Sequence, residues 1–147
     1  MRLFLLGAIL LLSACGASGE SSATAQPPRA ERITCHAAYR ASVEQGIERE
    51  ETLTFADEEA EQSVAFADQT FHAAYRSGEM DNERALRLWV TAGAPETVYQ
   101  SQLYQLPSDS GPQNQFVGGH GFTGLNYSYH PASGSEMQFW CAVETGE

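Results

Sequence analysis

Two tryptophans occupy positions from which a protein surface could contact another molecule. Trp89 comes two residues after Arg87, and Trp140 comes two residues after Gln138, each at a polar position of an alternating segment. In a strand, such positions point away from the core. An outward aromatic ring beside a polar or charged group supplies the apolar area and polar rim of a protein or sugar contact. The alternative is that each ring faces the true interior or packs under a loop.

His36 and His72 stand at matching positions of a short repeat, and histidines could hold a metal or transfer a proton. Residues 34–40 read TCHAAYR and residues 70–76 read TFHAAYR, so six of seven positions are identical. Neither an H-E-x-x-H motif nor a G-x-S-x-G turn accompanies them. We therefore expect no catalysis, metal or cofactor, and keep a histidine-dependent enzyme as the less favoured alternative. The candidate binding surface comprises Trp89, Trp140, Arg87, His36 and His72.

The charge of the chain restricts its partners. The formal net charge is −11, and all eight basic residues are arginines. Nucleic acids are bound mainly through cations that meet phosphates, so this balance argues against a nucleic-acid partner. It also disfavours a polybasic contact with anionic lipids and suits a cationic protein. A cell-wall glycan, against which outward tryptophans could stack, is the other partner that we consider.

The first fifteen residues resemble a bacterial lipoprotein signal. Arg2 precedes an apolar run from Leu3 to Leu12. This run is too short for a membrane-spanning helix, which needs about 20 apolar residues, and it is typical of an export signal. The next residues complete Leu12-Ser13-Ala14-Cys15, which resembles a lipobox. The resemblance implies cleavage before Cys15 and acylation of its thiol. An ordinary secretory signal with a chance cysteine is the alternative.

Three consequences follow for the domain organisation. Residues 1–14 form the signal peptide, and residues 15–32, rich in Ser, Ala, Gly and Pro, form a flexible tether. Gly16 stands where an Asp resembles an inner-membrane retention signal, so we expect the cell envelope and the outer membrane as the location. Residues 33–147 then form one folded domain, attached to the membrane through its anchor.

Eight segments of residues 33–147 alternate apolar and polar side chains with the period of two that is typical of half-buried strands. The first segment runs from Ile33 to Glu44, and the last extends from Met137 to Val143. The strands between them are marked by Leu53 and Phe55, Val64 and Phe66, Phe71 to Tyr75, Leu86 to Val90, Val98 to Leu106, and Leu125 to Tyr129. A polar loop covers residues 107–121. We therefore expect an all-β domain.

Seven or eight antiparallel strands can form a barrel or a β-sandwich. If Cys15 is acylated, Cys35 and Cys141 remain as an even pair in an oxidising compartment, and we expect a disulfide between them. Such a bridge would close a loop of about 106 residues and contribute roughly 4–5 kcal/mol in the chain-entropy model. Because the first and last strands of a barrel pair, a direct bridge favours a small antiparallel barrel, with the sandwich as the alternative.

Two short stretches resemble the membrane-bound lipoprotein inhibitors of C-type lysozyme. These are residues 124–128, GLNYS, and residues 137–140, MQFW. The resemblance implies a small barrel closed by a disulfide between the chain ends and an inhibitory contact with a very basic enzyme. Ala142 stands near the position of a lysine in that family. Our first hypothesis is a lipid-anchored envelope domain with a non-catalytic binding role, and inhibition of a cationic lysozyme or other wall hydrolase is the alternative.

Overall fold

The computed structural model describes residues 32–56, 60–76, 83–93, 96–106 and 111–144. The expected signal peptide, Cys15 and the tether up to residue 31 lie outside the described residues, whereas Arg32 already belongs to the first strand. None of the described segments is a helix long and apolar enough to cross a membrane.

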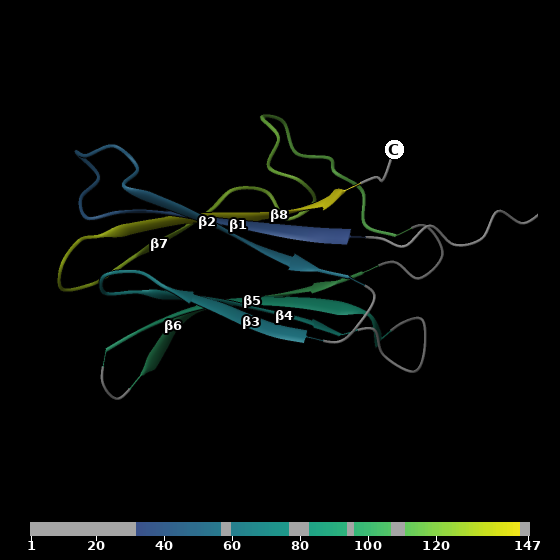
Figure 1. Ribbon diagram of the computed structural model, residues 1–147, viewed down its shortest axis with the longest axis horizontal. Helices are drawn as coiled ribbons and strands as arrows, with labels where there is room; N and C mark the ends of the chain where they lie inside the picture. Colours follow the sequence, from purple (N-terminus) through teal and green to yellow (C-terminus); the bar gives the residue numbers. More distant parts are fainter. Residues whose placement is uncertain (1–31, 57–59, 77–82, 94–95, 107–110, 145–147) are drawn as a thin grey trace, which may run out of the picture.

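Eight antiparallel strands form two sheets of four (Figure 1). The strands are β1 (Arg32–Arg40), β2 (Arg49–Phe55), β3 (Ala60–Ala65), β4 (Thr70–Arg76), β5 (Ala85–Ala92), β6 (Thr97–Gln105), β7 (Asn126–Tyr129) and β8 (Glu136–Glu144). Sheet A has the order β2-β1-β8-β7, and sheet B has the order β3-β4-β5-β6. The sheets lie as two layers in Figure 1. The expected all-β class is therefore confirmed.

The core lies between the two sheets and follows the alternation of the sequence. On β1, Cys35 and Ala37 are fully buried, and on β4, Phe71 and Ala73 are fully buried. The same cluster includes Leu86, Leu88 and Val90 of β5 and Met137, Phe139 and Cys141 of β8. Because strand side chains alternate between faces, residues one position away from these face outward. This alternation places His36, His72 and both tryptophans on the outer faces.

The expected closed barrel is wrong, although the pairing that suggested it is present. Strands β1 and β8 pair, Cys35 lies opposite Cys141, and the two form a disulfide. The strands follow one another around the domain, but no backbone ladder joins β2 to β3 or β6 to β7. The sandwich alternative describes the architecture.

Side chains bridge both seams where a barrel would have backbone ladders. Gln62 of β3 donates to the carbonyl oxygen of Thr54 on β2 over 2.7 Å, and Arg49 donates to the carbonyl oxygen of Ala65 over 2.9 Å. At the other seam, the Gln102 amide of β6 donates to the Asn126 side chain of β7 over 2.9 Å. Occupied in this way, the sheet edges are less open to pairing with another chain.

The segment 111–124 covers the part of β8 that β7 does not reach. The Asn114 side chain donates to the carbonyl oxygen of Val143 and accepts from its backbone N–H, as a neighbouring strand would. The Thr123 hydroxyl accepts a hydrogen bond from the Cys141 N–H. Gly121 lies so close that an added Cβ would stand 2.0 Å from the Cys141 carbonyl oxygen, and its φ is +61°. Only glycine fits there.

At one end of the sandwich, the Asp68 carboxylate connects the two sheets through hydrogen bonds. Asp68, between β3 and β4, accepts hydrogen bonds from the hydroxyls of Tyr39, Ser133 and Ser135. Burial alone would raise the pKa of Asp68, but these hydrogen bonds outweigh it and lower the pKa below its ordinary value. The ionised carboxylate thus connects a turn of sheet B with β1 and with the β7–β8 turn of sheet A.

Two strand predictions need correction in detail. The first strand ends at Arg40 rather than Glu44, because the chain turns there: the Gln45 N–H donates to the Ser42 carbonyl oxygen. Val43 is therefore 51% exposed. In β7, the marker tyrosines face outward, and the buried position belongs to Ser128.

Candidate functional site

The two copies of the repeat form equivalent inner strands of the two sheets. Residues 34–40 lie in β1, next to β8, and residues 70–76 form β4, next to β5. The registers match, because His36 lies opposite Trp140 and His72 lies opposite Trp89. Each histidine stacks on its tryptophan, with ring centroids 4.9 Å apart in sheet A and 4.8 Å apart in sheet B.

The candidate binding residues are therefore divided between two faces. His36 and Trp140 lie on the outer face of sheet A, whereas His72, Trp89 and Arg87 lie on the outer face of sheet B. The core separates the two sets, and the outer faces of the two layers point in opposite directions in Figure 1. The five side chains do not form one continuous surface.

The stack on sheet B is closed by bonds within the protein. The His72 Nε2 atom lies 2.8 Å from the Thr91 hydroxyl and 3.3 Å from the Glu96 carboxylate, and the His72 side chain is 13% exposed. The Thr91 hydroxyl in turn donates to Glu96. The Arg87 guanidinium lies 4.8 Å from the centroid of the Trp89 ring. The polar groups here have internal partners, which is typical of a stabilising arrangement.

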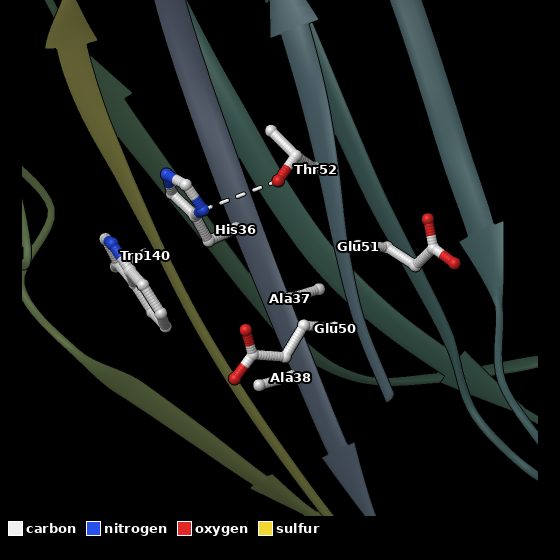
Figure 2. Close-up of a pocket in the computed structure, with 7 residues that line it drawn as sticks. All are labelled: His36, Ala37, Ala38, Glu50, Glu51, Thr52 and Trp140. Carbon is white, nitrogen blue, oxygen red and sulfur yellow. Dashed lines mark hydrogen bonds between the residues drawn. The ribbon is translucent and has the colours of Figure 1, made fainter. Parts of the chain in front are cut away.

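The equivalent stack on sheet A borders an open hollow. The hollow has a volume of about 510 Å³ and is lined by His36, Ala37, Ala38, Glu50, Glu51, Thr52 and Trp140 (Figure 2). Besides this stack, the described residues give the His36 side chain one polar contact, a long 3.5 Å approach of its Nδ1 to the Thr52 hydroxyl. His120, from the 111–124 segment, meets the Trp140 ring edge to face, with centroids 5.3 Å apart. The half-buried Trp140 thus forms an aromatic wall.

The two glutamates of the hollow differ in their partners. The Glu51 carboxylate accepts from two Arg49 nitrogens, at 2.8 and 2.7 Å. Glu50 is exposed, and within the described part of the chain no hydrogen bond or ion pair engages its carboxylate. Figure 2 shows the Glu50 carboxylate beside Ala38, on the Trp140 side, with Glu51 pointing away from it. The hollow therefore contains one uncompensated negative charge.

A neighbouring ion pair on this face is internally neutral. The Arg40 guanidinium lies 2.7 Å from the Glu136 carboxylate, whose side chain is 2% exposed. Burial alone would raise the pKa of Glu136, but hydrogen bonds from Arg40, Gln138 and Tyr129 hold it below its ordinary value. The Arg40 guanidinium is thereby neutralised and does not compensate the Glu50 carboxylate.

The exposed large apolar side chains gather around sheet A. They are Val43, Ile47, Phe116, Val117, Tyr127 and Tyr129, and only Val98 and Leu103 belong to sheet B among the described residues. The segments that carry Val43 and Val117 rise on the outer side of sheet A (Figure 1). Tyr127 and Tyr129 stack on each other with centroids 6.4 Å apart. None of these residues was among those predicted for the binding surface, although the alternation in β7, read with Ser128 as the core position, places both tyrosines outward.

A second hollow lies beside the loop that was expected over residues 107–121. Its volume is about 490 Å³, and its lining includes Tyr104, Leu106, Pro112 and Phe122. None of its lining residues is charged. It therefore offers no counterpart to the acidic group of the hollow on sheet A.

The chemistry of the sheet A site is that of contact and charge. Among residues 32–144, outside the four undescribed gaps, no group of three or more His, Cys, Asp or Glu side chains could hold a metal ion. The outer side of sheet A instead combines the aromatic wall of Trp140, the Glu50 carboxylate and several exposed apolar side chains. A scan against protein-family models finds no match for the chain, and searches of curated proteins and of solved structures find none either.

Proposed function

We propose that this protein is a non-catalytic binding domain of the cell envelope, and that the outer face of sheet A binds a cationic protein. The observation that carries the proposal is that most of the exposed large apolar side chains among the described residues lie on the same side of the domain as an acidic hollow. Val117 is 95% exposed and Tyr129 is 54% exposed, and both belong to this side of the domain. Exposed apolar patches with a polar rim are typical of protein interaction sites.

The sign of the partner's charge follows from the domain. The chain has a net charge of −11, and the free charge in the hollow is the Glu50 carboxylate. Opposite charge on the partner would accelerate association and exclude acidic proteins. A cell-wall glycan could stack on Trp140, but it does not account for the exposed apolar side chains on this side of the domain.

Inhibition of a C-type lysozyme or another cationic wall hydrolase is the specific form of this proposal. The stretches that resemble the lysozyme-inhibitor lipoproteins, residues 124–128 and 137–140, lie in and just before β7 and in β8. These strands carry Tyr127 and Trp140, which both belong to the proposed binding face. The likeness thus falls on the part of the domain that the geometry independently favours.

We also propose that acylated Cys15 anchors the domain in the outer membrane. The support is the lipobox-like sequence and the pair formed by the two other cysteines, which leaves Cys15 as the odd thiol. Metabolic labelling with an alkyne palmitate analogue tests the anchor. The label should enter the wild-type protein in the membrane fraction and be lost with Cys15→Ser, and labelling of the variant would contradict the proposal.

Binding is tested with the full chain carrying Cys15→Ser, immobilised and exposed to C-type lysozyme, other basic proteins, acidic proteins and peptidoglycan fragments. We expect binding of at least one basic protein that weakens as salt is added, since surface charges are screened. Binding to glycan fragments but to no basic protein would contradict the proposal. Undiminished lysis of a cell-wall suspension at excess domain would exclude the inhibitor form.

A further inference from the structure

We infer that the hollow on sheet A receives a single arginine side chain of the partner, held between the Glu50 carboxylate and the stacked Trp140 and His36 rings. This inference rests on the proposed function, because it names the group through which the cationic partner is recognised. Equivalent positions in the two sheets differ in a way that points to this ligand.

Sheet B already contains such an arginine. Its row of facing residues is Glu61 on β3, Ala74 on β4 and Arg87 on β5, and the Arg87 guanidinium lies 4.8 Å from the centroid of the Trp89 ring. Trp89 in turn stacks on His72. Arginine over an aromatic face gains from cation–π attraction and from planar stacking.

Sheet A repeats this row with one change. Glu50 on β2 faces Ala38 on β1, and Ala38 faces Gln138 on β8. Gln138 therefore stands where sheet B has its arginine, and its amide donates to Glu136 over 2.7 Å. The acid, the alanine, the histidine and the tryptophan are retained while the cation is missing.

The space and the charge left on sheet A fit an arginine from outside. The lining includes Ala38 of β1, whose small outward side chain leaves room in a hollow of about 510 Å³. Among the described residues, no arginine lines it. The nearby Arg40 is paired with Glu136, and Arg49 is paired with Glu51. A guanidinium can bind a carboxylate with two parallel hydrogen bonds and stack at the same time. A lysine ammonium can satisfy the charge but cannot stack in this way.

The test uses the ¹⁵N-labelled full chain with Cys15→Ser and the tripeptide acetyl-Gly-Arg-Gly-amide, beside its citrulline and lysine analogues. The indole N–H signals of Trp140 and Trp89 report on the two sheets separately. We expect the arginine peptide to shift the Trp140 signal in a saturable way, leave Trp89 unchanged, and bind about tenfold more tightly than the neutral citrulline peptide. Equal binding of citrulline, or no shift of Trp140, would overturn the inference.

Two variants and a matched control complete the test. Glu50→Gln should weaken binding of the arginine peptide about tenfold, because it removes the free charge, whereas Glu61→Gln, at the equivalent position of sheet B, should leave the affinity unchanged. Gln138→Arg should abolish binding, because it supplies to sheet A the arginine that sheet B has. The unchanged Trp89 signal verifies that each variant is folded.

Equal effects of Glu50→Gln and Glu61→Gln, or full binding by Gln138→Arg, would overturn the inference. Failure here is distinguishable from failure of the proposed function. A basic protein that binds the wild type and Glu50→Gln equally well would preserve the binding face and exclude the arginine site.

Discussion

Sheets A and B contain the same short sequence and the same stacked pair of rings, yet their surroundings differ. On sheet B, His72 is engaged by Thr91 and Glu96, and Arg87 lies over Trp89. On sheet A, the stacked His36 has one polar side-chain contact among the described residues, the 3.5 Å approach to Thr52. The position equivalent to Arg87 is occupied by Gln138. The stack itself is thus compatible with a purely structural role. The difference that bears on function is the arginine over the tryptophan, which sheet B contains and sheet A lacks.

The interiors of the two sheets also differ at equivalent positions. Sheet A has the Cys35–Cys141 disulfide where sheet B has Phe71 opposite Val90. Changing both cysteines to serine should lower the free energy of unfolding by about 4–5 kcal/mol, because the bridge spans most of the domain. Urea unfolding measures this loss.

Phe71→Ala provides the comparison for the disulfide. It should cost about 3–5 kcal/mol through the cavity that it leaves in the core. A double serine variant as stable as the wild type would show that the bridge adds nothing to the packing of sheet A.

The histidines should separate the sheets by stability. His72→Ala removes side-chain bonds to Thr91 and Glu96 and should cost about 1–2 kcal/mol in free energy of unfolding. His36→Ala removes only a stack and a 3.5 Å contact, so the cost should be about 0.5–1 kcal/mol. Thermal and urea unfolding of both variants measure the difference. A larger loss of unfolding free energy for His36→Ala than for His72→Ala would contradict the view that only the sheet B stack is held by polar contacts.

Acid should loosen the contacts that Asp68 and Glu136 make. The pKa of each carboxyl is lowered in the folded protein, so each contributes stability above its unfolded pKa, and this contribution is lost as the pH falls through the folded pKa. The ordinary pKa is 3.8 for an Asp carboxyl and 4.5 for a Glu carboxyl. Stability should therefore fall with acid below these values.

Asp68→Asn isolates the connection between the two sheets. It should cost about 1 kcal/mol at neutral pH, because the ionised acceptor of three hydroxyls is lost, and it should flatten the acid dependence. Unfolding curves from pH 7 to pH 3 test this. An acid dependence identical to that of the wild type would assign the effect to other groups.

The sequence predicts the strands and the disulfide better than it predicts the architecture. Alternation located all eight strands, because one face of each strand is less exposed than the other, and the cysteines paired as expected. The choice between barrel and sandwich depends on whether neighbouring strands share a backbone ladder. At the seams, Gln62, Arg49 and Gln102 make side-chain bonds instead. The presence of polar residues in an edge strand does not predict which of them will make such bonds.

The candidate site was predictable only in part. The repeat identified His36 and His72, and the alternation placed both tryptophans outward, as the structure shows. The separation of these residues onto opposite faces depends on strand order, which alternation does not specify. Glu50 stands out because no described residue pairs with its carboxylate, whereas the neighbouring Glu51 is bound by Arg49. Such pairing is a property of the folded register.

The most direct test of the account is to observe which outer face a cationic protein touches. The chain has two tryptophans, one on each outer face, so their indole N–H signals distinguish the sheets. We expect the basic protein that binds most tightly to shift or broaden the Trp140 signal and to leave the Trp89 signal in place. A shift of Trp89 with Trp140 unchanged would contradict the assignment of binding to the outer face of sheet A.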